Sequence, residues 1–177
     1  MTTSPDSFIC PHCGESHEGL PRDISYQLPD EIWAMPTKER EERAKFDSDL
    51  CSCEGRFFIR GLLQIPFRHE PDYFGWGAWV EVERLVFQRY LEVYDKDAAD
   101  EPAHAGALAN QLPSYGRVIG TPVEIQFGTS RQRPTIRCLS TANSELAIEQ
   151  RQGIDSARHH EILEIYEAEK AARRNTD

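Results

Sequence analysis

Two cysteines near the start of the chain, Cys10 and Cys13, have the spacing of a metal-binding pair, as in a zinc knuckle. Two thiolates three residues apart can bind one ion when the chain turns between them, and Gly14 permits the positive φ that such turns use. A zinc ion takes about four ligands, so two more residues are needed. A thioredoxin-like redox pair is a poorer interpretation, because Gly14 and a loop stand where a helix is expected.

The remaining ligands are sought among His12, His17, Cys51 and Cys53. The side chain of His12, between the two cysteines, tends to point away from the ion, whereas His17 is far enough along for the chain to curl back. Cys51 and Cys53 share one face of an expected strand, but strand rise separates them by about 6.6 Å. Two sulfurs bound to one zinc must be closer than that. One of these cysteines together with His17 is therefore the easier geometry.

Such a zinc ion would be structural, because four protein ligands leave no open position for water. Its binding would contribute on the order of 10 kcal/mol to the folding of the N-terminal lobe. The chain has no Ser/His/Asp order, no Gly-rich phosphate loop and no His-Glu-x-x-His helix. The sequence therefore gives no support to an enzyme and assigns no catalytic residue.

The charge of the chain limits its partners. The 177 residues carry a formal net charge of -10 and a pI near 5.1, which repels nucleic-acid phosphates and anionic membranes. No apolar signal core or membrane-length apolar run is present, so we expect a cytoplasmic protein with reduced thiols. The expected partner is another protein, with neither nucleic acid nor membrane, and the oligomeric state is left open.

The elements that must position these residues follow from periodicity and turn signals. Pro36 opens a helix, and Glu54-Gly55 is a plausible two-residue hairpin turn between alternating strands. Asp155 is a good N-cap for a charged last helix, in which His159 and His160 are expected to be solvated. The predicted helices are 37–46, 82–94, 104–112 and 156–174, and the predicted strands are 50–53, 56–65, 73–81, 121–127 and 134–139.

These elements predict an α+β fold, an antiparallel sheet of hairpins with helices covering one side and an N-terminal zinc-knuckle lobe. We expect a single domain over 1–177. It comprises a zinc-binding N-terminal lobe (1–55), a sheet with helices (56–155) and a C-terminal helix (156–177). Trp76 and Trp79 fall on opposite faces of their strand. Packing in the interior explains Trp76, and Trp79 is expected to pack under a helix, with a surface aromatic anchor for a partner as the alternative.

A series of short motifs runs through the chain. They are Phe8-x-Cys10-x-x-Cys13-Gly14-x-x-His17-x-Gly19-Leu20-Pro21, Ser48-Asp49-Leu50-Cys51, Phe57-Phe58-x-Arg60-Gly61, Phe74-x-Trp76-Gly77-x-Trp79-Val80, Leu112-Pro113-x-Tyr115, Arg133-Pro134 and Leu146-Ala147-x-Glu149-Gln150. In this combination the chain resembles the bacterial family called domain of unknown function 2199. The resemblance implies Cys10, Cys13, His17 and Cys51 as the metal ligands, with Cys53 an addition of this chain, and it implies no activity.

Together these observations predict a zinc-binding bacterial protein with a structural Zn2+ that serves as a protein-interaction module. A stress, regulatory or toxin-neutralising role would suit such a compact acidic protein. The alternative is a small metalloenzyme whose metal keeps an exchangeable position.

Overall fold

The computed structural model of the protein describes residues 7–9 and 14–175. Its helices are short except for the last one, and its two longest strands are neighbours in sequence. The elements are β1 (Ser7–Ile9), β2 (Ser16–Glu18), β3 (Asp23–Ser25), α1 (Asp30–Trp33), α2 (Thr37–Arg43), β4 (Ala44–Phe46), β5 (Leu50–Cys53), β6 (Arg56–Pro66), β7 (Tyr73–Val82), α3 (Arg84–Val93), β8 (His104–Leu108), β9 (Pro122–Gln126), β10 (Thr135–Cys138), α4 (Glu145–Gln152) and α5 (Ser156–Arg174).

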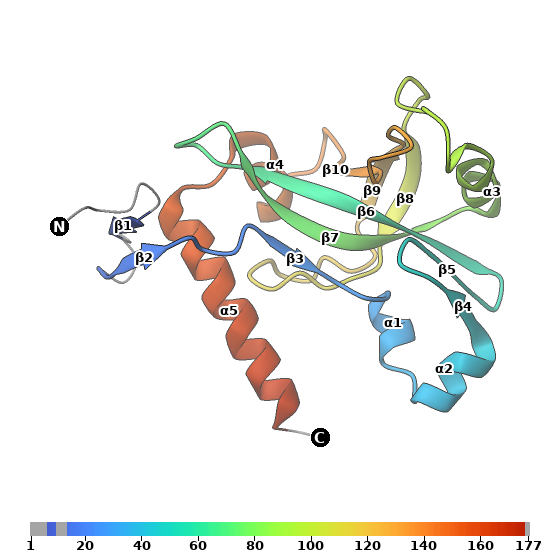
Figure 1. Ribbon diagram of the computed structural model, residues 1–177, viewed down its shortest axis with the longest axis horizontal. Helices are drawn as coiled ribbons and strands as arrows, with labels where there is room; N and C mark the ends of the chain where they lie inside the picture. Colours follow the sequence, from blue (N-terminus) through green and yellow to red (C-terminus); the bar gives the residue numbers. More distant parts are fainter. Residues whose placement is uncertain (1–6, 10–13, 176–177) are drawn as a thin grey trace.

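The main sheet has eight strands in the order β3-β7-β8-β9-β10-β6-β5-β4, and β6 also pairs with β7. That extra pairing closes β6, β7, β8, β9 and β10 into a small barrel, with β5 and β4 continuing from β6 (Figure 1). Most pairs are antiparallel, but β10 lies parallel to β6 and β3 lies parallel to β7. The α+β class is correct, whereas a sheet made only of antiparallel hairpins is wrong.

The helices surround the barrel rather than cover one side of it. Figure 1 shows α3 at one end of the sheet, α4 and α5 toward the other end, and α1 and α2 below β4 and β5. β1 and β2 form a separate two-stranded sheet beside α5. Within the residues that the structure describes, no zinc-knuckle lobe is seen. None of the described helices is long and apolar enough to cross a membrane.

Two hydrophobic clusters lie on opposite faces of β7, because successive side chains of a strand alternate between its faces. Trp76 belongs to the larger cluster, which fills the barrel and the space under α3, α4 and α5. Trp79 belongs to a smaller cluster beneath α1 and β4. Both indoles are fully buried, as expected from the strand pattern.

The Glu54-Gly55 turn forms as predicted, and both residues have positive φ, 49° and 81°. The helix predicted over 104–112 is wrong, because this segment forms β8 between β7 and β9. A Cβ atom on Gly106 would lie only 2.4 Å from a methyl group of Val80, so the small residues of this segment let two strands approach closely. Tertiary packing here overrides the helical preference of alanine.

The helix over 37–46 is shorter than predicted, since α2 ends at Arg43 and the next three residues form the edge strand β4. The last helix is confirmed, and the Asp155 carboxylate accepts a hydrogen bond from the Arg158 backbone N–H at 2.8 Å. Its two histidines are not solvated, because both are buried, His159 against Phe67 and Phe74.

Candidate functional site

The predicted zinc ligands can be placed only in part. Cys10 and Cys13 lie outside the described residues. The backbone of His17 belongs to β2, where it pairs with Phe8. Cys51 lies in β5 opposite Phe58 of β6. The set of four ligands therefore stays a prediction.

Cys51 occupies an apolar interior. It is 1% exposed and shares the smaller hydrophobic cluster with Cys53, Leu28 and Trp79. Burial, followed by the proximity of Cys53 and Asp47, raises the pKa of the Cys51 thiol to about 12. Zinc binds the thiolate, so a zinc ion at Cys51 would have to displace the thiol proton.

β2 and β5 lie toward opposite ends of the molecule in Figure 1, and the structure does not bring Cys51 beside the strand that carries His17. Among the described residues, no group of three or more histidine, cysteine, aspartate or glutamate side chains is arranged to hold a metal ion. Since Cys10 and Cys13 fall outside that part of the chain, this finding concerns the described residues only. Within the described residues, the Cys51 side chain packs in the smaller hydrophobic cluster.

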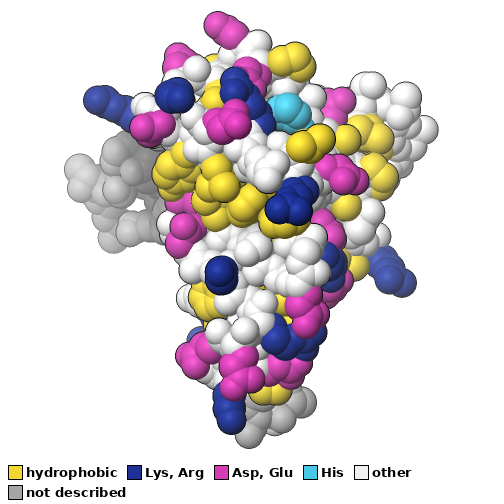
Figure 2. Space-filling view, turned by 90° about the vertical axis from the view of Figure 1, so that its right-hand side faces the viewer, with side chains coloured by type: hydrophobic (Ala, Val, Ile, Leu, Met, Phe, Trp, Pro, Cys, Tyr) yellow, Lys and Arg dark blue, Asp and Glu magenta, His cyan; other side chains and the backbone are white. Residues whose placement is uncertain are grey.

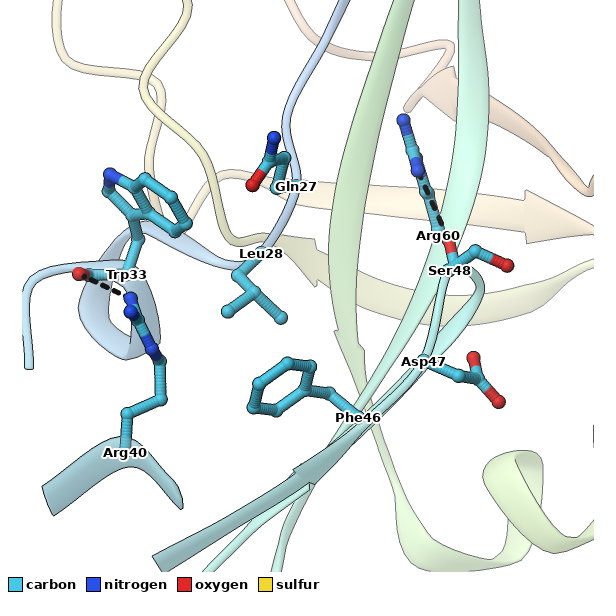
Figure 3. A pocket seen from close by; sticks show the side chains of 8 residues that line it. All are labelled: Gln27, Leu28, Trp33, Arg40, Phe46, Asp47, Ser48 and Arg60. Atoms are coloured by element: carbon cyan, nitrogen blue, oxygen red, sulfur yellow. Dashed lines mark hydrogen bonds between the residues drawn. The ribbon is translucent and has the colours of Figure 1, made fainter. Parts of the chain in front are cut away.

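A cleft of about 430 Å³ opens between α1, α2 and the loop that follows β4. We call it the α2 cleft. Trp33 and Phe46 are 53% and 45% exposed, although both are large aromatic residues. In Figure 3, Leu28 and Phe46 face each other across the apolar part of the cleft, with the Trp33 ring beside them and Ser48 and Arg60 at the other end.

A second cleft of about 460 Å³, the α5 cleft, lies between α1 and the C-terminal half of α5. Gln27, Leu28 and Trp33 line both clefts, so Trp33 stands between them. We call the two clefts together the Trp33 groove. The hydroxyl of Tyr26, at the wall of the α5 cleft, is buried and has no hydrogen-bond partner within the described chain.

The buried side chain of Asn110 anchors the start of α1, the helix that carries Trp33. The Asn110 amide accepts from the backbone N–H of Trp79 at 2.8 Å and donates to the Leu28 carbonyl at 2.9 Å. It also donates to the Asp30 carboxylate at 2.8 Å, which joins the first residue of α1 to the barrel. Arg40 holds the exposed end of α1, since its guanidinium lies 4.8 Å from the Trp33 ring centre and donates to the Trp33 carbonyl.

The loop between β4 and β5 carries a polar network beside the α2 cleft. Asp49 accepts from Arg133 at 2.6 Å, from Tyr94 at 3.1 Å and from Ser48 at 2.8 Å. Burial alone would raise the pKa of Asp49, but these three hydrogen bonds lower it below its usual value. Arg60 donates to the Ser48 carbonyl, while its Nε is buried without a partner. Segments far apart in sequence thus converge on this loop.

Another polar network lies under α5, on the far side of the barrel. Glu149 accepts from Tyr115 at 2.5 Å and from Arg158 at 2.7 Å. The Arg158 guanidinium lies 5.3 Å from the Tyr115 ring centre and donates to the Ser114 carbonyl. We call these residues the Glu149 network. Its charged groups are paired and mostly buried, which suits a structural role.

The sequence did not point to the Trp33 groove. Trp33 stands in a six-residue segment between Pro29 and Pro36, and this was the available signal, because a tryptophan so close to two prolines cannot lie in a long buried strand or helix. The basic residues of the groove are spread from Arg40 to Arg174, so only the fold brings them together.

Other exposed apolar side chains lie on α3, where Leu85 and Leu91 are 77% and 50% exposed. Figure 2 views the molecule from the side that carries α3 in Figure 1, and hydrophobic side chains gather there in a band with acidic and basic groups around it. Because Leu85 and Leu91 are exposed and lie outside the Trp33 groove, they can serve as control positions for substitutions of the aromatic residues in the groove.

The fold and the groove define a mixed α+β protein built on a small closed barrel, with an open aromatic groove and no metal-binding cluster in the part of the chain that is described. The model of the DUF2199 family, described as uncharacterized proteins conserved in bacteria, matches residues 9–154. The chain belongs to this bacterial family, as the sequence motifs indicated. No curated protein and no solved structure matches the chain.

Proposed function

We propose that this protein is a non-enzymatic interaction module that binds a protein partner in the Trp33 groove. The observation that carries the proposal is the exposure of two large aromatic side chains, Trp33 and Phe46, at one cleft. Tryptophan is among the residues most enriched at the energetic centres of protein interfaces. Trp33 stands on a helix whose first residue is bonded to Asn110, and Arg40 lies over its ring, so both contacts reduce the conformational entropy that binding would cost.

The chemistry of the groove supports binding rather than catalysis. The described residues that line its two clefts include no histidine and no cysteine. Ser48 of the α2 cleft donates to Asp49, and the hydrogen bonds that Asp49 accepts from Arg133 and Ser48 lower the pKa of this carboxyl. A carboxylate whose pKa is lowered in this way is a weak general base.

The test is retention of a partner from a bacterial lysate by immobilised wild-type protein and by Trp33→Ala/Phe46→Ala. We expect at least one protein that the wild type retains and the double variant loses. The matched control is Leu85→Ala/Leu91→Ala, which removes exposed apolar groups from α3 and should retain the same protein. Retention that is unchanged by the Trp33 and Phe46 substitutions, or lost equally in the control, contradicts the proposal.

We further propose that the N-terminal segment binds a structural zinc ion through Cys10, Cys13 and His17, with Cys51 as the fourth ligand implied by the family motifs. The support is the spacing of the cysteine pair and the family membership. A bound zinc ion would cross-link the segment and stabilise it. The buried, apolar surroundings of Cys51 do not fit this ligand set as the described chain stands, so Cys51 is the residue to test.

Zinc content of the protein purified after growth in zinc, measured by mass spectrometry, tests this proposal. About one zinc ion per chain is expected, with loss in Cys10→Ser and Cys13→Ser. Loss of zinc in Cys51→Ser supports the set of four ligands, whereas retained zinc with lowered thermal stability assigns Cys51 to the core. Zinc-free wild-type protein contradicts the proposal.

A further inference from the structure

The two clefts adjoin each other at Trp33, because Gln27, Leu28 and Trp33 line both of them. The groove runs from the β4–β5 loop, past α1, to the end of α5. A ligand that fills both clefts must therefore be elongated. Its central part would contact the exposed face of Trp33, which is the part of the groove common to both clefts.

The charge of the groove is opposite to that of the whole chain. The chain has a net charge of -10, yet basic side chains outnumber acidic ones around the groove. The basic residues are Arg40, Arg60, Lys170, Arg173 and Arg174, and the acidic residues are Asp30, Asp47 and Glu169.

Two of the three acidic side chains are committed to the fold. The Asp30 carboxylate accepts from the Asn110 amide and from the Gln111 backbone N–H, both at 2.8 Å. The Asp47 carboxylate accepts from the backbone N–H groups of the next loop residues, Asp49 and Leu50, at 2.8 Å. Hydrogen bonds from these neutral donors fix the positions of the two carboxylates but leave their charges in place, so the lining has five basic side chains against three acidic ones.

Cations stand beside aromatic rings in both clefts. In the α2 cleft the Arg40 guanidinium lies 4.8 Å from the Trp33 ring centre. In the α5 cleft the Lys170 ammonium lies 5.7 Å from the Tyr166 ring centre. A ligand that combines carboxylates with a bulky apolar side chain matches both kinds of group.

From this arrangement we propose that the groove binds an extended acidic peptide segment of the partner, with an aromatic or large aliphatic side chain packed on Trp33. This inference rests on the proposed function and adds the chemical class of the partner. Nucleic acid is the weaker fit, since Asp30, Asp47 and Glu169 would repel a continuous row of phosphates. A peptide can place its carboxylates only where the basic side chains stand.

The experiment measures fluorescence anisotropy with the full chain and three labelled peptides that share a central Trp-Leu pair. One peptide carries glutamate and aspartate around this pair, one carries glutamine and asparagine, and one carries lysine. We expect the acidic peptide to bind about tenfold more tightly than the neutral one, with the lysine peptide weakest, and the difference should shrink as salt is added. Equal binding of the acidic and neutral peptides overturns the inference.

Charge reversal in the protein supplies the matched test. Arg40→Glu/Lys170→Glu should abolish or invert the preference for the acidic peptide. Arg84→Glu/Arg137→Glu changes the net charge equally at exposed positions outside the groove and should preserve it. Equal loss in both double variants assigns the preference to overall charge and overturns the inference.

Two further measurements distinguish a failure of this inference from a failure of the proposed function on which it rests. A labelled single-stranded oligothymidine that binds in a Trp33-dependent way more tightly than the acidic peptide overturns the inference in favour of nucleic acid. A lysate protein that is retained through Trp33, while no acidic peptide binds, overturns the inference and leaves the interaction module standing. Acidic peptide binding that Trp33→Ala leaves unchanged contradicts the groove as the binding place.

Discussion

The Glu149 network and the Trp33 groove contain the same kinds of side chain in opposite circumstances. Each pairs an arginine with an aromatic ring, Arg158 with Tyr115 and Arg40 with Trp33. In the Glu149 network the arginine is bound to carboxylates and a carbonyl, and Tyr115 is 3% exposed. In the groove Arg40 has one backbone carbonyl as its hydrogen-bond acceptor in the described chain, and Trp33 is 53% exposed.

This difference separates structural polar groups from groups available to a ligand. Buried ionic groups that are fully paired hold α4 and α5 on the barrel, and removing one partner leaves the other without compensation. Exposed aromatic and cationic groups contribute little to folding, because solvent already contacts them. Substitutions in the two regions should therefore affect different measurements, stability for the Glu149 network and binding for the Trp33 groove.

The largest effect is expected where the groove is anchored to the barrel. Asn110→Leu leaves the Trp79 N–H and the Leu28 carbonyl without their partners, so we expect a loss of about 3 kcal/mol of unfolding free energy. Urea unfolding followed by tryptophan fluorescence measures this loss. A loss below about 1 kcal/mol contradicts the anchoring role of Asn110.

The Glu149 network should give the next largest loss. Arg158→Ala leaves the Glu149 carboxylate, 13% exposed, without its charged partner, and we expect a loss of about 2 kcal/mol. The same urea experiment measures it, and peptide binding by the folded variant should stay at the wild-type value. Weakened peptide binding by the folded variant would show that the Glu149 network also affects binding, and it would contradict the separation of the two regions.

A pH effect on stability should come from His159 on the same side of the barrel. Burial lowers the pKa of His159, so the folded state favours the neutral ring, whose Nε2–H donates to the Pro21 carbonyl at 2.7 Å. The lowered pKa contributes stability above the usual value near 6.5, and this contribution is lost as the pH falls. Thermal melts at pH 7.5 and 5.5 should show a decrease in the midpoint that His159→Gln reduces.

A wild-type midpoint that rises on acidification contradicts the assignment of a neutral His159 in the folded protein.

The smallest effect on stability is expected at Trp33 itself. Because its ring is largely exposed, Trp33→Ala should change the unfolding free energy by no more than about 0.5 kcal/mol. Acidic peptide binding should weaken by about tenfold or more in the same variant. A large loss of stability would make Trp33 a structural residue and would remove the contrast with Tyr115.

The parts of the structure that local pattern determines were predictable from the sequence. The Glu54-Gly55 turn, the alternation of Trp76 and Trp79, and the last helix with its Asp155 cap all depend on neighbours in the chain. Long-range packing was not predictable. Gly106 pairs closely with Val80, which turns an expected helix into β8, and Phe67 and Phe74 bury His159.

The candidate site shows the same limit. Cysteine spacing drew attention to the N-terminal segment, and Cys51 was added from the family motifs, but its side chain packs in an apolar cluster of the main sheet. The groove could not be predicted from the sequence. Its residues Arg40, Trp33 and Lys170 come from separate helices, which lie around one groove only in the folded protein. Local sequence patterns thus predict helices and strands better than they predict the sites that these elements form together.

The central claim is that a partner binds at Trp33 and leaves the barrel interior unchanged. The chain has three tryptophans, and Trp76 and Trp79 are fully buried while Trp33 is exposed, so the three indole N–H signals in a nitrogen-15 NMR spectrum report on distinct places. On titration with the acidic peptide, we predict that the Trp33 signal shifts and saturates while the signals of Trp76 and Trp79 stay in place. Binding detected by anisotropy without a shift of the Trp33 signal would contradict the account.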